Sequence, residues 1–144
     1  MGDIEVVEAV QRRAVKAVSN LKSQNYEDRL QELGMDTMEE RRKRGDLLMA
    51  YRVFSGKDNV DPAIWFKSYG PPEAAVRAVT RNQYGYQNVE IPEWNGEMRR
   101  NFWSVRVCEP WNSLPDPVKK SDSVNCFKNS LDNFKGWGGQ KPRR

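Results

Sequence analysis

The sequence predicts a mainly α-helical protein: a compact domain of about five to six helices with a small extended or two-stranded insert near residues 76–94. Apolar residues recur at three- and four-residue steps over most of the chain, as on the buried side of helices. Residues typical of helix ends, such as Asn25 and Gly34, bound these periodic segments. Alternation with period two occurs at residues 84–91, which therefore predict extended chain.

The first two helices are expected over residues 4–21 and 26–33. The first carries one apolar stripe that is expected to face inward: Ile4, Val7, Val10, Ala14, Val18 and Leu21. The second lies between Asn25, whose side chain can accept a bond from a first-turn amide, and Gly34, which suits a left-handed helix end. The residues expected to face inward on it are Tyr26, Leu30 and Leu33.

The third helix has the clearest start signal in the chain. Thr37 is followed three residues later by Glu40, a capping-box pattern in which each residue satisfies an amide of the other. The helix is expected to end at Gly56 and to bury Leu47, Leu48, Tyr51 and Phe54. Gly45 in its interior costs about 1 kcal/mol relative to Ala. Close approach of a ligand backbone or of another helix could explain this glycine, and close helix packing is favoured.

Asp61 and Pro62 predict a further short helix, because Asp caps helices and Pro fits the first helical position. An apolar cluster follows at residues 64–66, and then the helix-breaking Gly-Pro-Pro of residues 70–72. We expect a single domain over residues 1–135, made of a helical half and a strand-plus-helix half. The expected halves are residues 1–69 and 73–135.

The second half is expected to resume as a helix near Glu97 and to end at Pro110, since proline lacks an amide donor. Phe102 and Trp103 lie on its apolar faces and are expected in the core. The last helix is expected over residues 123–135, capped by Ser121 or Ser123 and stopped by Gly136. Its buried face is expected to be Val124, Phe127, Leu131 and Phe134, and residues 136–144 are expected to form a disordered basic tail.

Composition excludes several classes of enzyme. The chain has no histidine, so the usual base for a serine or cysteine nucleophile is missing. Its acids alternate with bases, and it carries no phosphate-binding or dinucleotide-binding glycine motif. Cys108 and Cys126 have no partner at metal-site spacing, so they are expected to be two buried thiols, with a disulfide as the alternative. We expect no independent catalysis and no cofactor or metal.

The chain also lacks a secretory signal and an apolar run long enough for a membrane span, so we expect a cytoplasmic or nuclear protein without a membrane partner. The formal net charge of +4 arises in the last segment, because residues 111–144 carry seven bases and three acids. A basic segment of this kind suits a polyanion such as nucleic acid.

Eight basic residues are the candidates for nucleic-acid contact. They form three groups on predicted helices: Arg12, Arg13 and Lys16; Arg41, Arg42 and Arg44; and Arg99 with Arg100. Arginine suits this role because its planar fork can bond two phosphate oxygens. The alternative for each group is a solvated helix face with no partner.

Several motifs occur together in a characteristic order. They are Gln11-Arg12-Arg13, Tyr26 to Leu30 with Leu33-Gly34, Arg44-Gly45-Asp46-Leu47, Asp61-Pro62, Arg100-Asn101-Phe102, Trp111-Asn112-Ser113-Leu114-Pro115, and Val124 through Phe127-Lys128 to Leu131-Asp132. In this order and spacing they resemble the C-terminal, thumb-like region of reverse transcriptases from non-long-terminal-repeat retrotransposons of the jockey and chicken-repeat type. The resemblance covers most of the chain, from about residue 11 to about residue 134.

The resemblance implies a helical region downstream of the polymerase palm that holds RNA or the template–primer duplex. The palm's Tyr-x-Asp-Asp signature is absent, so the expected function is non-catalytic contact with an RNA or DNA backbone, in a fragment or a co-opted remnant of such an element. The alternative is a co-opted protein–protein interaction domain that binds partners through exposed aromatic residues and does not bind nucleic acid.

Overall fold

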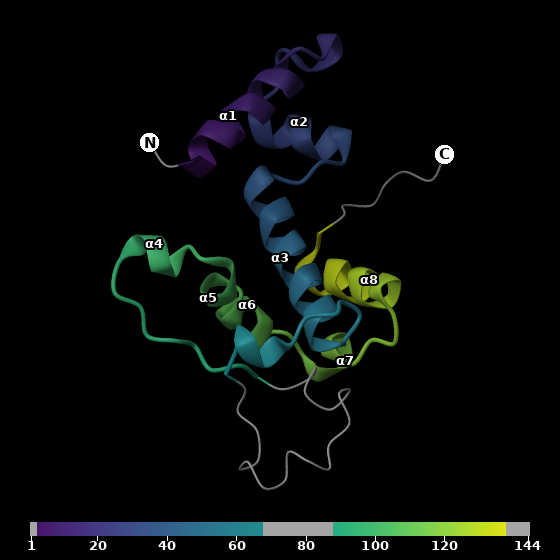
Figure 1. Ribbon diagram of the computed structural model, residues 1–144. Coiled ribbons are helices and arrows are strands. Elements are labelled where there is room, and N and C mark those ends of the chain that lie inside the picture. The colour runs from purple at the N-terminus through teal and green to yellow at the C-terminus, as the bar shows by residue number, and fades with distance from the viewer. Residues whose placement is uncertain (1–2, 68–87, 138–144) are drawn as a thin grey trace, which may run out of the picture. The chain divides into compact units, whose positions relative to one another are not determined.

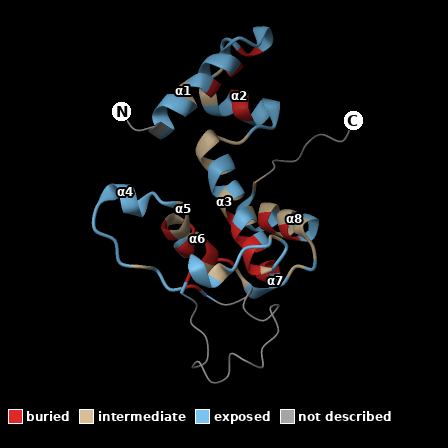
Figure 2. Cartoon of the chain, in the orientation of Figure 1, coloured by how far each residue is buried: buried red, intermediate tan, exposed pale blue. Residues whose placement is uncertain are grey.

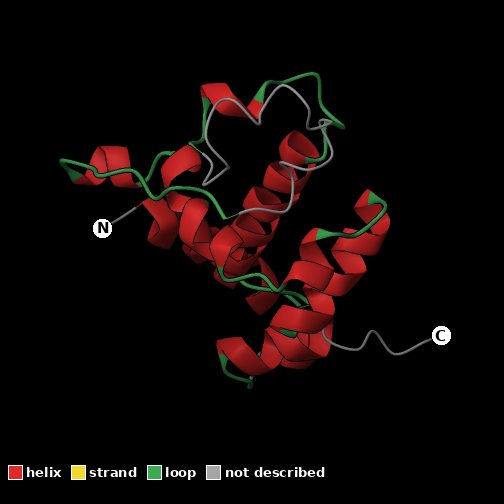
Figure 3. Cartoon of the chain, turned by 90° about the horizontal axis from the view of Figure 1, so that it is seen from below, coloured by secondary structure: helices red, strands yellow, loops and turns green. Residues whose placement is uncertain are grey.

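The computed structural model describes residues 3–67 and 88–137 of the chain and confirms that it is mainly helical. Helices and loops, without a strand, make up these described residues (Figures 1 and 3). The α-helices are α1 (Asp3–Lys16), α2 (Tyr26–Leu33), α3 (Met38–Phe54), α4 (Glu97–Arg100), α5 (Trp103–Arg106), α6 (Cys108–Asn112), α7 (Asp116–Lys119) and α8 (Val124–Lys135), and the 3-10 helices are η1 (Ser19–Leu21) and η2 (Pro62–Ile64).

Contacts divide the chain into two compact units. The first unit comprises residues 1–44 and 131–144, and the second comprises residues 45–130. Both α3 and α8 therefore contribute one end to each unit. The break expected at residues 70–72 lies outside the described residues, so the predicted boundary between residues 69 and 73 stays a prediction.

In the first unit, α1 packs against α2 on a different face from the one the apolar pattern indicates. Val15 and Gln11 are buried, whereas Ile4, Val7 and Val10 are 39%, 45% and 63% exposed. The amide group of Gln11 fixes this orientation, because its Nε2 donates to the Tyr26 hydroxyl at 3.2 Å and to the Asp36 carbonyl at 3.0 Å. The predicted inward stripe is thus wrong for the residues of α1, which ends at Lys16, whereas Leu21 in η1 is buried as expected.

Helix α2 has the predicted bounds and caps. The Asn25 side chain accepts a bond from the Asp28 amide at 2.8 Å, and Gly34 has the left-handed φ of 61°. Leu30 is buried as expected, but Leu33 is 38% exposed. Arg29 is buried instead, because its guanidinium donates to the carbonyls of residues 21 and 22 at 2.8 and 3.1 Å.

Helix α3 begins with the predicted capping box. The Thr37 amide donates to the Glu40 carboxylate at 3.0 Å, and the Glu40 amide donates to the Thr37 hydroxyl at 3.2 Å. The helix buries Leu47, Tyr51 and Phe54, and Leu48 is half-buried. Gly45 is not at a close packing contact, since a Cβ there would meet nothing within 4 Å. The interpretation of Gly45 as a helix-packing residue is therefore wrong.

The core of the second unit is a chain of aromatic rings, and its burial is visible along α3, α5 and α6 in Figure 2. Trp111 is fully buried and tilted against Phe54, with ring centroids 4.9 Å apart, and against Phe127 at 6.2 Å. The chain continues from Phe127 to Tyr51 on one side, at 4.3 Å, and from Phe54 to Phe66 on the other, at 4.9 Å. Each large ring contributes burial of about 150–250 Å².

An extended segment is held against this core by side chains. The Asn112 amide donates to the Val89 carbonyl and its oxygen accepts from the Val89 amide, both at 2.8 Å, so Asn112 serves Val89 as a neighbouring strand would. The Glu90 amide donates to the Lys67 carbonyl at 2.7 Å. Residues 68–87, which include most of the predicted insert, lie outside the described residues.

The helix expected from Glu97 to Pro110 is three short helices, α4, α5 and α6. The Arg106 guanidinium donates to the Asn101 carbonyl at 2.6 Å, which fixes the break between α4 and α5. Pro110 does not end a helix but is the third residue of α6. First-turn amides have no partner within a helix, so a proline there loses nothing.

The C-terminal part contains α7, which the sequence analysis missed, and α8, which it predicted. Ser123 caps α8, since its hydroxyl accepts from the Cys126 amide at 3.1 Å, and Gly136 follows the helix with φ 69°. Phe127 and Leu131 are buried as expected, and Phe134 is 47% exposed. The predicted tail lies mostly outside the described residues.

Replacing Asn112 with Ala removes both hydrogen bonds to Val89, whose backbone groups are buried with it. We expect the free energy of unfolding in urea to fall by about 2–4 kcal/mol, the cost of leaving a donor and an acceptor unsatisfied. The control is Asn129→Ala on exposed α8 surface, which should change stability by less than about 0.5 kcal/mol. Equal stabilities of the two variants would show that the hydrogen bonds between Asn112 and Val89 do not stabilise the fold.

The two cysteines are unpaired, and they differ in environment. Cys108 is buried and Cys126 is exposed, so the expectation of two buried thiols is wrong for Cys126. Burial raises the pKa of Cys108 to about 11. The thiolate is the reactive form, so Cys108 is protected both by the core and by protonation.

We expect a chromogenic disulfide reagent to modify Cys126 rapidly in the folded protein and Cys108 only after unfolding. Cys126→Ser should abolish the rapid phase, because the remaining thiol is the buried one. A rapid reaction in Cys126→Ser, followed by absorbance at neutral pH, would show that Cys108 is accessible.

Candidate nucleic-acid interface

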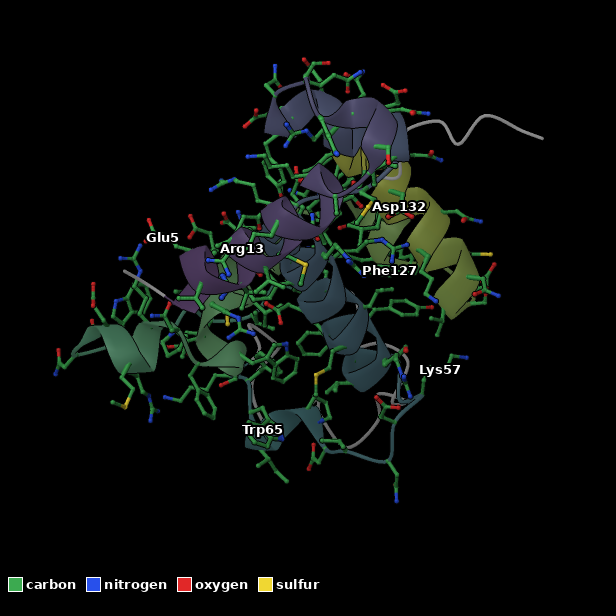
Figure 4. The ribbon with its side chains drawn as sticks, turned by 90° about the horizontal axis from the view of Figure 1, so that it is seen from above. Glu5, Arg13, Lys57, Trp65, Phe127 and Asp132 are labelled. Carbon is green, nitrogen blue, oxygen red and sulfur yellow. The ribbon has the colours of Figure 1, made fainter. Side chains whose placement is uncertain are left out.

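Three of the eight predicted contact residues lie on the second half of α1, in the first unit. Arg12, Arg13 and Lys16 are all exposed, and Arg13 projects from α1 in Figure 4. The Arg12 guanidinium lies 4.9 Å from the centroid of the Tyr26 ring, in a cation–π position. Arg13 and Lys16 are in the last turn of α1, where cations interact favourably with the helix dipole.

Helix α1 is fixed by a polar network beside these cations. Glu8 accepts bonds from the Tyr26 hydroxyl and, at 2.9 Å, from the Met38 amide at the start of α3. Burial, followed by the hydrogen bond to Glu8, raises the pKa of Tyr26 to about 12. Tyr26 is therefore a neutral hydrogen-bond donor at neutral pH, and the network holds α1 to α2 and to the start of α3.

The second predicted group lies at the start of α3, also in the first unit. Arg41 and Arg42 are exposed, and Arg41 contacts the Met38 sulfur at 3.8 Å. Lys43 is paired with Glu39 at 2.6 Å on the exposed surface. The acids flanking this group therefore neutralise Lys43 but do not pair with Arg41 or Arg42 among the described residues.

Arg44 differs from the other candidates, because its guanidinium group is hydrogen-bonded to a carboxylate of the same protein. Its Nε and Nη2 donate to the two oxygens of Asp132 at 2.6 and 2.7 Å, a bidentate pair that raises the pKa of Arg44. The side chains are 30% and 22% exposed. In the structure, Arg44 links α3 to α8 within the first unit through this ion pair.

Arg99 and Arg100 lie on α4, in the second unit, and both are exposed. Neither forms an ion pair with another described residue. Phe102, two residues after Arg100, is 54% exposed, and Trp103 is half-buried. The expectation that both rings lie in the core is wrong for Phe102.

Three other described cations of the second unit, Arg52, Arg106 and Lys119, have partners within the unit. Arg106 donates to both oxygens of Asp46 at 2.8 and 2.9 Å, and Arg52 pairs with Asp58 at 2.6 Å. Lys119 is 1% exposed; its Nζ donates to Asn88 at 2.8 Å and lies 5.8 Å from the centroid of the Trp111 ring. Burial lowers the pKa of Lys119. Lys119 and Arg106 are thus engaged within the fold, whereas the Arg52–Asp58 pair lies at the surface.

Sequence patterns did not reveal four polar residues that hold the fold together: Gln11, Arg29, Asn112 and Lys119. Each is a polar side chain whose buried partner is a backbone group or a side chain distant in sequence. The one available signal was the presence of Gln11, Arg29 and Asn112 in the motifs that carry the family resemblance.

The described residues contain no group of three or more histidine, cysteine, aspartate or glutamate side chains placed to hold a metal ion. Within the same residues, no helix has the length and apolar character that a membrane span requires. In the comparisons with known proteins, no family model matches the chain, and no curated protein or solved structure matches it significantly.

Breaking the pair between Arg44 and Asp132 tests its structural role. We expect Arg44→Gln and Asp132→Asn each to lower the free energy of unfolding by about 1 kcal/mol, a value reduced by partial exposure. The double variant should cost about as much as either single variant, because each removes the same interaction. Strictly additive losses in urea unfolding would show that the two side chains do not interact.

Proposed function

We propose that this chain is a non-catalytic nucleic-acid-binding module that contacts an RNA or DNA backbone, as the thumb-like region of a retrotransposon reverse transcriptase would. The observation that carries the proposal is the set of exposed, unpaired cations in the first unit. Five of the predicted contact residues belong to this set: Arg12, Arg13, Lys16, Arg41 and Arg42. No ion pair among the described residues engages any of them, whereas Lys43 and Arg44 in the same unit are paired.

Chemistry supports backbone contact over base readout for these residues. Guanidinium and ammonium groups on exposed helix surfaces neutralise phosphates without selecting a sequence. The 131–144 segment of the same unit adds four bases and one acid, so the first unit has more cationic than anionic side chains. Binding of this kind is salt-dependent, because each neutralised phosphate releases condensed counterions.

A salt titration with matched variants tests the proposal. We expect a fluorescent RNA strand to bind the protein with log affinity that falls by ~0.7 per phosphate contact as log salt rises. Arg13→Gln/Lys16→Gln/Arg42→Gln should weaken binding and reduce the slope by about two units, because these side chains have no structural partner among the described residues.

The control variant carries Lys57→Gln, Lys120→Gln and Lys128→Gln in the second unit, which makes the same change in net charge. It should retain most of the affinity and slope. Equal losses in the two triple variants would mean that net charge alone drives binding. Absence of binding to RNA and to DNA duplex at low salt would overturn the proposal.

A second function is supported by a different observation on α1. Its apolar residues Val6, Val7 and Val10 are 53%, 45% and 63% exposed, more than a helix in a fully covered core would show. An exposed apolar face of this kind is typical of protein–protein contact. If the protein self-associates and binds no nucleic acid, a protein-interaction domain becomes the better description.

A further inference from the structure

Two aromatic rings in the second unit are solvent-accessible and lie next to each other. Trp65 follows η2 and is 45% exposed, and Phe102 lies between α4 and α5 and is 54% exposed. Their ring planes are 19° apart in orientation and their centroids are 6.4 Å apart. The Trp65 side chain lies on the outside of its unit, as Figure 4 shows.

Both rings keep part of their surface accessible to solvent. Atoms in direct contact lie about 3.5–4.0 Å apart. Tyr51 and Phe127, which do stack directly in the core, have centroids 4.3 Å apart at 12°. The Trp65 and Phe102 centroids lie farther apart, at 6.4 Å, and about half of each side chain stays exposed. The arrangement therefore offers near-parallel aromatic surface to a third flat group.

The rings are held in place by the core behind them. The Trp103 ring stands edge-on to Trp65 at 6.5 Å and to Phe66 at 5.3 Å, and Phe66 packs on Phe54. The Trp103 indole N–H points to the Asp46 carbonyl at 3.4 Å. Rings fixed in this way lose little conformational freedom when a ligand binds.

The backbone of each ring residue is also fixed. The amide of Trp65 donates to the Pro62 carbonyl at 3.0 Å, in the turn that Asp61 caps. The carbonyl of Phe102 accepts from the amides of Val105 and Arg106, both at 3.0 Å. The two side chains therefore project from turns that backbone hydrogen bonds hold in place.

Exposed cations flank the two rings in sequence. Arg99 and Arg100 precede Phe102 on α4, which also carries Glu97, and Lys67 follows Trp65. This charge pattern favours an anionic strand over a cationic ligand such as a methylated ammonium group, which arginines would repel. Flat aromatic surface with cations beside it matches the chemistry of single-stranded nucleic acid: bases that stack and phosphates that pair.

We propose that Trp65 and Phe102 form a stacking site for an unpaired nucleobase, with Arg99 and Arg100 contacting the adjoining phosphates. This inference rests on the proposed nucleic-acid binding and adds a preference for single strands. In a duplex, neighbouring base pairs already cover the faces of each base, so duplex gains nothing from the site. Stacking uses the face of the base, so the site should accept any of the bases.

The test compares single-stranded RNA, the same RNA as a duplex, and an abasic strand that keeps its phosphates. We expect Trp65→Leu and Phe102→Leu each to weaken binding of the single strand about tenfold, the order of magnitude of one lost stack. Duplex and abasic-strand affinities should change less than about twofold. Phe102→Tyr should restore single-strand binding, because it keeps the ring.

Trp94→Leu is the matched control. Trp94 is 40% exposed in the same unit and pairs with no other ring among the described residues, so this variant should bind the single strand as the unmodified protein does. Circular dichroism and urea unfolding should show that all variants remain folded.

Single-strand affinity unchanged in both leucine variants, with nucleic-acid binding intact, would overturn the stacking site and leave the proposed function standing. No nucleic-acid binding by the unmodified protein would overturn both. Self-association that Phe102→Leu abolishes, without any RNA binding, would assign the same rings to a protein interface.

Discussion

The burial of Trp111 is the constraint on which the second unit depends. Its ring is inaccessible to solvent and contacts rings from α3 and α8, so it sets where those helices can lie within the unit. The next residue, Asn112, fixes the extended segment at Val89, and Lys119 reaches the same segment at Asn88. One short helix, α6, thus carries both a fully buried ring and the side chain that binds the extended segment. The exposed rings Trp65 and Phe102 are positioned through this core, because Trp103 and Phe66 connect them to Phe54.

Residues in the motifs that resemble the retrotransposon family mostly serve the fold in this chain. Arg44 and Asp132 pair across the first unit, and Asp46 pairs with Arg106 in the second. Gln11, Arg29 and Asn112 bind backbone carbonyls or amides. In this chain the contacts give these residues a structural role. Inheritance of the fold and inheritance of nucleic-acid binding are therefore separate questions. A chain could keep these structural contacts and its fold while the exposed cations that would contact a polyanion change.

Local signals predicted local structure well. The capping box at Thr37, the caps of α2 and α8, and the glycines after α3 and α8 all involve residues within a few positions of each other, and the structure confirms them. The sequence predictions were wrong where a residue distant in the sequence determines the orientation or the bounds of a helix. The Gln11 amide is hydrogen-bonded to residues 15 and 25 positions away, and the face of α1 that carries Gln11 is buried in place of the apolar stripe. The Arg106 guanidinium binds the Asn101 carbonyl at the break that divides one expected helix. For the candidate interface, exposure of Arg13 and Arg42 follows from their sequence context, whereas the pairing of Arg44 with a residue 88 positions away does not.

The pair of hydrogen bonds between Asn112 and Val89 is also sensitive to a chemical change of the Asn112 side chain. Its side chain must donate to one group of Val89 and accept from the other, and among the small side chains a primary amide does both. Hydrolysis of that amide to a carboxylate would leave two acceptor oxygens, one of them facing a carbonyl. The spontaneous ageing of a single asparagine, with no change in the gene, would therefore loosen the extended segment at Val89 and make the age of a preparation a variable in its stability.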